Sequence, residues 1–356
     1  MILDKQNILL RKTAGYLFTV ILTFVFLYIA LKNVDLKKSI NIISHSSIPA
    51  IVLYIFIFFA AHFVRAIRWK FMIDSIKKDV SIIHLFGSVM IGYGVSCIIP
   101  RLGELYRGLF LGRWENISRT TVIGTIVIER IIDVAAFAFA ALISVYIYSG
   151  NLYDKVSWLK ASLITGFVLI FIMIFFLIFI VRYKGKFNET IIRMVGKISP
   201  NLANKLKNIF ETLITGLSSI TGLRNIISIS FFTILMLGLY AANAFVGFYV
   251  LGMEKICTIT YGISWVVMTI SAFGVMIPTP GGTGSYHLIT IFALTQLFAF
   301  DYETSAAYAI FTHLISYILC ILSSVFLIYL INLKRKRQGL KSENIFSVFS
   351  VKNGYK

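Results

Sequence analysis

The chain has 356 residues, of which 58% are hydrophobic and only 14% are charged, and its mean hydropathy is +0.86. Soluble domains carry about 25% charged residues, so this composition excludes an ordinary water-soluble protein and predicts one that lies largely in the bilayer. The net charge of +19 does not predict a nucleic-acid partner, because the basic residues lie between long apolar runs rather than in one stripe. Basic loops beside an anionic leaflet are the simpler interpretation.

The cysteines and histidines predict no metal, no cofactor and no disulfide framework. Cys97, Cys257 and Cys320 lie far apart without a CxxC pair, and the five histidines are scattered. The chain also lacks the P-loop, GxSxG and HExxH motifs. We therefore expect no catalytic residues of these soluble enzyme classes.

The predicted fold class is an all-α integral membrane protein. Its strongly apolar stretches are 14–31, 48–64, 82–100, 119–148, 159–181, 226–251, 256–277, 286–300 and 305–332. The first lacks a small-x-small cleavage site and is expected to be a retained span rather than a signal peptide. A full span needs about 20 residues. The stretches 82–100 and 256–277 run into proline- and glycine-containing breaks and 286–300 is short, which is typical of transport-type sites.

The distribution of charge predicts the topology. If 82–117 and 256–300 are re-entrant hairpins entered from opposite sides, the chain has six full spans. One side then holds 27 of the 34 Lys and Arg residues and the other side holds six. By the positive-inside rule we expect a multi-pass protein of the cell membrane with both termini cytoplasmic. Eight full transmembrane helices remain the alternative.

This arrangement contains a possible inverted repeat. Spans 48–64 and 119–148 flank the first hairpin, and spans 226–251 and 305–332 flank the second in the opposite direction. The two predicted tips share a short fragment, Ile99-Pro100-x-x-Gly103 in one and Ile277-Pro278-x-x-Gly281 in the other. A match this short can also arise by chance, so homology of the halves stays open.

Outside the spans the sequence predicts little globular structure. Residues 1–335 are expected to form one membrane domain, and 336–356 a short basic cytoplasmic tail. Within 182–224, apolar residues recur at helical spacing: Leu202, Leu206, Ile209, Leu213 and Leu217. This pattern predicts either an amphipathic helix on the inner interface or a linker helix packed on the cytoplasmic face.

Charges at membrane depth cost roughly 2.5–3.5 kcal/mol each on insertion scales and therefore mark candidate sites. The densest group follows Pro100 and contains Arg101, Glu104 and Arg107, with Gly103 allowing a tight backbone at the hairpin tip. Glu104 and Arg107 can pair on one helical face, and the two arginines could hold a phosphate. The alternative is a cytoplasmic loop that only satisfies the positive-inside rule.

Two further charged groups can also be interpreted either as a functional site or as ordinary structure. Glu129, Arg130 and Asp133 lie inside the 119–148 span and could either lock helices together or line a polar cavity. Arg65 and Arg68 close the second span, where basic residues are often interfacial anchors. We include all five as candidate substrate-binding residues.

A run of breakers follows the 256–277 stretch. It contains Pro278, Pro280, Gly281, Gly282 and Gly284. Non-helical backbone at membrane depth is tolerated only inside protein or along a wet cavity, so these residues, together with Gly103 at the first tip, are candidate gating residues. A plain extracellular turn is the alternative.

Taken in order, these motifs resemble the lysylphosphatidylglycerol synthase transmembrane-region family, also called flippase-like or UPF0104 proteins. The residues that carry the resemblance are Arg65, Arg68, Trp69, Pro100, Arg101, Gly103, Glu104, Arg107, Glu129, Arg130, Asp133 and the glycine-rich motif 278–284. His287 stands where the family typically has a glutamate, which weakens any mechanism that needs a carboxylate there; we count it with the gating residues.

The resemblance implies a function for the membrane part alone. In the best-known members a soluble domain transfers lysine to phosphatidylglycerol, and the membrane region moves the product lipid between leaflets. This chain is expected to be a stand-alone flippase-like module that transports a membrane phospholipid or a polyprenyl-phosphate lipid. The alternatives are the membrane part of a lipid-modifying transferase with a soluble partner, such as a phosphatidylglycerol lysyltransferase-like enzyme, and a non-transporting assembly factor.

Overall fold

The computed structural model describes residues 2–148, 150–182 and 222–349, with 2–14 as backbone only, and a few residues between 192 and 216. In this part of the chain all regular structure is helical. The predicted amphipathic segment falls mostly outside it. Of its apolar positions only Leu202 is described, and Leu206, Ile209, Leu213 and Leu217 lie outside the described residues, as does the tail beyond residue 349.

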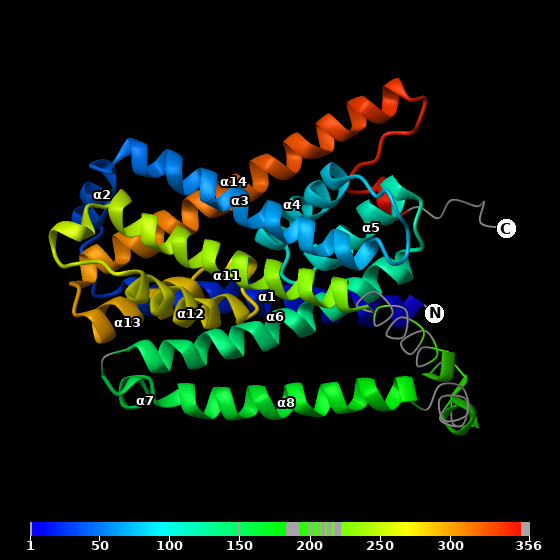
Figure 1. Cartoon of the computed structure of the whole chain (residues 1–356), viewed down its shortest axis with the longest axis horizontal. Coiled ribbons are helices and arrows are strands. Elements are labelled where there is room, and N and C mark those ends of the chain that lie inside the picture. Colours follow the sequence, from blue (N-terminus) through cyan, green and yellow to red (C-terminus); the bar gives the residue numbers. More distant parts are fainter. Residues whose placement is uncertain are drawn as a thin grey trace.

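Six long helices form the body of the protein (Figure 1). They are α1 (Ile2–Leu31), α3 (Ile48–Ile73), α6 (Arg119–Ile147), α8 (Ser157–Arg182), α11 (Leu223–Val250) and α14 (Tyr302–Arg337), joined in part by α2 (Leu36–Ser44) and α7 (Leu152–Lys155). Within the described chain, length and hydropathy alone qualify α3, α11 and α14 as membrane spans. Gly15–Leu31 of α1 and α2, bent by 87° relative to each other, pass the same test as a pair and add a fourth if the pair is one span. α6 has 29 residues, and it carries the charged group around Glu129.

The breaks at Pro100 and Pro278 produce two helical hairpins, as the sequence predicts. The first pairs α4 (Ile82–Ile98) with α5 (Gly103–Glu115), and the second pairs α12 (Tyr261–Met276) with α13 (Ser285–Phe298) through the short η2 (Pro280–Gly282). In both hairpins a glycine lets the two arms touch. A Cβ on Gly103 would collide with the carbonyl oxygen of Gly92, and one on Gly274 would lie 2.7 Å from that of Ser285.

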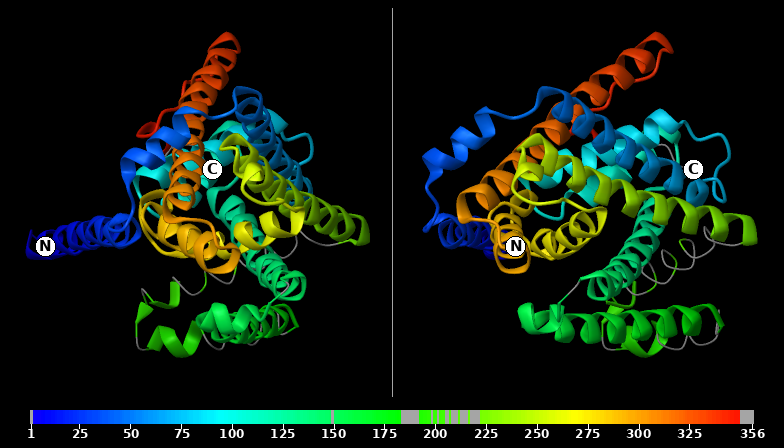
Figure 2. Two further views of the ribbon diagram at one scale, coloured as in Figure 1. Left: turned by 90° about the vertical axis from the view of Figure 1, so that its left-hand side faces the viewer. Right: turned by 60° about the vertical axis from the view of Figure 1, so that its left-hand side comes forward.

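The hairpins open toward opposite ends of the bundle and meet at their tips. α1 begins and α14 ends at one end of the bundle, and α4–α5 opens toward that end (Figure 1). α12–α13 opens toward the other end, which faces the viewer in Figure 2 (left). At the tips, a Cβ on Gly281 would lie 3.3 Å from Cys97 Cα, and the Tyr317 hydroxyl donates a hydrogen bond to the Cys97 carbonyl. Among the described residues, six long helices accompany the two hairpins.

The packing follows an inverted repeat. α3 and α11, the first helices of the two units, pack along each other; α4 packs on α14 and α12 on α6. Each hairpin is therefore covered by the last helix of the other unit. This exchange places the charged face of α3 next to α5, α6 and α11, where the candidate site forms.

Candidate functional site

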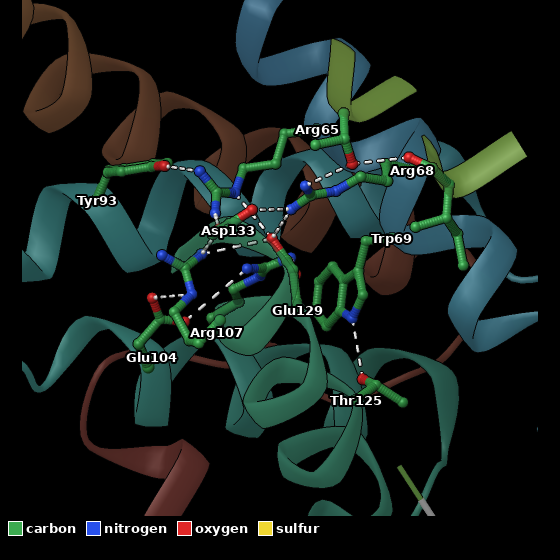
Figure 3. Close-up of polar contacts among 12 residues, drawn as sticks. Arg65, Arg68, Trp69, Tyr93, Glu104, Arg107, Thr125, Glu129 and Asp133 are labelled. Carbon is green, nitrogen blue, oxygen red and sulfur yellow. Dashed lines mark hydrogen bonds and ion pairs between the residues drawn. The ribbon is translucent and has the colours of Figure 1, made fainter. Parts of the chain in front are cut away.

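The candidate charged residues on α3, α5 and α6 converge in one place (Figure 3). Arg65 and Arg68 are three residues apart on α3, and Glu129 and Asp133 are four apart on α6, so each pair shares a helix face. Below, the arginine–carboxylate cluster means seven residues: Arg65, Arg68, Glu104, Arg107, Glu129, Arg130 and Asp133.

Glu129 is the centre of this cluster and is fully buried. Its Oε1 lies 2.9 Å from Arg65 Nε and 3.0 Å from Arg68 Nη2. Its Oε2 lies 2.6 Å from Arg107 Nη2, so the first hairpin is attached to α6 through this carboxylate. A buried carboxylate is tolerated when several charged hydrogen bonds replace its water, and Glu129 has four, the longest at 3.4 Å from Arg130 Nη2.

Asp133 is the second buried carboxylate. It pairs with Arg68 Nη2 at 2.6 Å and with Arg130 Nη2 at 3.3 Å, and it also forms an ion pair with Arg65. Two carboxylates on one face of α6 therefore hold two arginines of α3. This pairing fixes the guanidinium planes before any ligand arrives.

The cluster is open on one side. There Arg130 Nε lies 3.3 Å from Glu104 Oε1, and their side chains are 39% and 42% exposed. Arg107 Nη1 lies 3.8 Å from Glu104 Oε2, which makes the predicted pair on α5 a long one. Four guanidinium groups against three carboxylates leave the cluster with a formal charge of +1.

Aromatic and hydroxyl side chains support the arginines from outside the cluster. Arg107 stacks 3.8 Å above the Trp69 ring, whose Nε1 donates to Thr125 Oγ1 at 3.0 Å. Arg65 Nη1 donates to the hydroxyls of Tyr93 and Tyr240 at 2.5 and 3.3 Å. Arg68 Nη1 donates to Thr233 Oγ1 at 3.2 Å.

Sequence reasoning did not single out Thr125, Thr233, Tyr93 or Tyr240. The signal that could have found the last two is a hydroxyl ring in an apolar helix. Such a ring needs a polar partner when it is buried, and the partner is known only once the helices are packed.

Arg101 is not part of the cluster. It is exposed at the tip of the first hairpin, before α5 begins at Gly103, and its φ of 64° is in the left-handed region. None of the hydrogen bonds or ion pairs among the described residues involves Arg101. This is the candidate guanidinium whose donors are not already used by the protein's own carboxylates.

The glycine-rich motif forms the tip of the second hairpin and is packed inside the protein. Gly281, Gly282 and Gly284 all have positive φ. A Cβ on Gly284 would lie 2.6 Å from the Thr23 carbonyl oxygen of α1, and one on Gly281 would lie 2.6 Å from the Tyr317 ring. Pro278 and Pro280 bracket this turn. The motif thus contacts α1, α4 and α14, which a plain extracellular turn would not do.

His287 belongs to this second group rather than to the cluster. Its Nδ1 accepts a hydrogen bond of 3.3 Å from Gly284 N–H and so caps α13. Its ring lies 4.7 Å from that of His313, whose Nε2 is 3.1 Å from Thr283 Oγ1. His313 was not singled out from the sequence. Across the described chain, no three His, Cys, Asp or Glu side chains are grouped to hold a metal ion.

Comparisons with known proteins agree with these motifs. The sequence profile of the family described as lysylphosphatidylglycerol synthase TM region matches residues 15–324. A UPF0104 membrane protein of Methanocaldococcus jannaschii is 25% identical over 316 residues, which are 84% of this chain and 90% of that protein. Another, from Methanothermobacter thermautotrophicus, is 27% identical over 110 residues, or 29% of this chain and 31% of that protein. The profile match includes both hairpins and the whole cluster, and the chain belongs to the lysylphosphatidylglycerol synthase transmembrane-region family.

Proposed function

We propose that this protein moves a lipid with a phosphate-bearing headgroup between the leaflets of the cell membrane, with both termini cytoplasmic. The observation that carries the proposal is the cluster's formal charge of +1 together with its opening at Arg130 and Glu104. If the cluster only held the helices together, an excess positive charge at its exposed edge would add nothing to their stability. An anion that enters there can be bound without displacing the buried carboxylates.

The two halves of the cluster take different roles in this proposal. Arg65 and Arg68 are held by Glu129 and Asp133 and act as a rigid support. Arg130 offers its guanidinium at the open side. A headgroup phosphate competes there with Glu104, whose carboxylate is the most exposed in the cluster. Arg101, at the adjoining hairpin tip, supplies a second contact.

The hairpins supply the path. They open to opposite ends, and their tips meet where Gly281 lies against Cys97 and Tyr317. Helices broken near the middle of the membrane, in matching positions of two inverted halves, are the arrangement used by many secondary transporters. In the proposed cycle, separation of the tips connects the cluster to the opposite leaflet.

Leaflet exchange in liposomes tests this function. Purified protein is reconstituted with labelled phosphatidylglycerol, lysyl-phosphatidylglycerol or a polyprenyl phosphate, and the rate at which label reaches the other leaflet is measured. We expect at least one of these lipids to exchange faster than in empty liposomes. Arg130→Gln should slow that exchange roughly tenfold or more, because a charged hydrogen bond contributes about 1.5–3 kcal/mol.

Lys70→Gln is the matched control, since Lys70 is a 32%-exposed cation on α3 that pairs with Asp74 outside the cluster. It should leave the exchange rate unchanged. Equal exchange with and without protein for all three lipids would overturn the proposal. In that case the membrane part of a transferase that needs a soluble partner becomes the better explanation.

A further inference from the structure

A groove of about 570 Å³ lies between the start of α3 and the end of α11, at the end of the bundle toward which α12–α13 opens (Figure 1). Part of its wall is apolar and is formed by Ala50 and Leu53 of α3 with Phe245 and Tyr249 of α11. The Ser47 N–H donates to the Val250 carbonyl oxygen at 2.9 Å and ties the two helices together beside the groove. The groove therefore lies on the seam between two helices that qualify as membrane spans.

The other part of the wall is polar. α11 ends in a turn through Gly252, with φ +67°, and the short helix η1 (Met253–Lys255) follows. The turn folds Lys255 back, so that its Nζ lies 3.9 Å from the position of a Cβ on Gly252. Glu254 Oε2 is buried and has no hydrogen-bond partner among the described residues. A cation and an unused carboxylate oxygen thus line one side of the groove.

The composition of the groove identifies the class of its occupant. Leu53 is 48% exposed and lies on a helix that qualifies as a membrane span, so the apolar wall suits an acyl chain. Lys255 suits a phosphate, and the unpartnered Glu254 oxygen needs a hydroxyl or ammonium donor. A phospholipid whose headgroup carries a hydrogen-bond donor meets all three requirements.

The groove and the arginine–carboxylate cluster lie on the same helix pair. Arg65 comes 17 residues after Ile48 on α3, which at 1.5 Å per residue is roughly 25 Å along the axis. The hydrocarbon core of a bilayer is about 30 Å thick. The cluster and the groove therefore lie near opposite membrane boundaries, joined by the seam of α3 with α11.

From these observations, and resting on the proposed function, we propose that this groove is a phospholipid-binding site at the far leaflet. It receives the lipid whose headgroup leaves the arginine–carboxylate cluster. Lys255 binds the phosphate there, and Glu254 accepts a hydrogen bond from the headgroup.

Photolabelling of the full-length protein in liposomes tests the site. A phosphatidylglycerol probe with a photoreactive group in its acyl chain is irradiated, and the labelled peptides are mapped by mass spectrometry. We expect label at 48–53 and 245–255 in excess of the lipid-facing surface around Phe56, which is 70% exposed on the same helix. Ala50→Trp, which fills the groove, should reduce that label about tenfold, and Phe56→Trp should leave it unchanged. Equal label at both surfaces, or label insensitive to Ala50→Trp, would overturn the site.

Two further variants test the chemistry without changing the shape of the groove. Lys255→Gln and Glu254→Gln should weaken labelling by the phosphatidylglycerol probe but not by a diacylglycerol probe, which lacks the phosphate. Equal labelling by both probes in wild type would reduce the site to a hydrophobic crevice and overturn the headgroup assignment. If Ala50→Trp unfolds, Leu53→Trp replaces it, with size-exclusion chromatography as the check.

The failure of this site and the failure of the proposed function have different signatures. Exchange that depends on Arg130, with no label in the groove, overturns only the groove. Specific label in the groove, with no exchange by wild-type protein, keeps the lipid site and overturns its role in transport.

Discussion

Within the cluster, neutralisation of Glu129 should have the largest effect on the stability of the protein. Three guanidiniums lie within 3.0 Å of its carboxylate, and the side chain is fully buried. Glu129→Gln keeps the shape but leaves these cations under-compensated. Removing one partner of a buried ion pair costs roughly 3–5 kcal/mol, so we expect a large fall in thermal stability, measured by fluorescence-detected size-exclusion chromatography after heating.

Glu104→Gln is the comparison for that prediction. Its carboxylate is 42% exposed and its ion pairs lie at 3.3 and 3.8 Å, and exposed pairs contribute about 0–1 kcal/mol. We expect an almost unchanged stability. Loss of the Glu104 carboxylate should instead alter lipid exchange, because the substitution removes the group that competes with the phosphate. Equal destabilisation by both variants would show that the open side of the cluster is structural.

A second carboxylate, at the end of α5, predicts a dependence on pH. Burial alone would raise the pKa of Glu115, but hydrogen bonds from His84 and the Ser81 N–H, with the nearby Lys77, outweigh it and lower this pKa below its ordinary 4.5. The folded state thus favours the charged form. Its contribution to stability is present above the ordinary pKa and is lost as pH falls through the lowered one.

We therefore expect Glu115→Gln to be less stable than wild type near neutral pH and to approach it below about pH 4. Thermal unfolding across that range measures the difference. Asp74→Asn, which replaces a 36%-exposed acid that pairs with Lys70, controls for a general effect of acid. A gap between wild type and Glu115→Gln that stays constant with pH would contradict the assignment.

At the scale of elements, the tip of the second hairpin depends on glycine. Gly284 has φ +87°, and a Cβ there would lie 2.6 Å from the Thr23 carbonyl oxygen of α1, which is rigid backbone. Gly284→Ala therefore meets both backbone strain of about 1–2 kcal/mol and a clash. We expect a loss of more than about 2 kcal/mol, seen as a lower melting temperature, and weaker packing of the tip against α1.

Gly166→Ala is the matched change, because that glycine lies in α8 with nothing within 4 Å of the added Cβ. Alanine there should stabilise by roughly 0.5–1 kcal/mol through higher helix propensity. If both substitutions changed the stability in the same direction, the packing of Gly284 against α1 described above would be wrong.

The elements also show how far sequence reasoning reaches. Prolines and glycines inside apolar stretches were enough to predict both hairpins, because their effect on the backbone is local. The pairing of Glu104 with Arg107 followed from helical spacing and is present at 3.8 Å. Arg101 was grouped with Arg107 by spacing, but α5 begins only at Gly103, so Arg101 lies off the helix.

Partners from distant helices could not be predicted in the same way. Tyr93, Thr233 and Tyr240 reach the cluster because α4 and α11 are packed beside α3. The sequence around these residues does not indicate which helix they face. The groove near Lys255 was missed for the same reason, since it depends on how α3 and α11 end against each other.

At the scale of the whole molecule, the proposed cycle separates the two hairpin tips, and we expect the first hairpin to move against α14 when they separate. In this structure they are tightly packed: a Cβ on Gly94 would lie 3.0 Å from the Cys320 carbonyl oxygen, and the buried side chains of Cys97 and Cys320 belong to one hydrophobic cluster. Oxidation to a disulfide would join α4 to α14 close to the meeting point of the two tips. A link between two elements that must separate should stop lipid exchange, whereas one between elements that move together should not.

We therefore expect oxidation with iodine, which enters the bilayer, to form a Cys97–Cys320 bond and to slow lipid exchange several-fold, with recovery after reduction. Mass spectrometry of the non-reduced protein shows whether the bond has formed, and Cys257, which lies away from both, reports general oxidation. Cys320→Ser should make exchange insensitive to iodine. A disulfide that forms in full yet leaves exchange unchanged would mean that the tips open by movement of α12–α13 alone, with α4 and α14 as the fixed half of the protein.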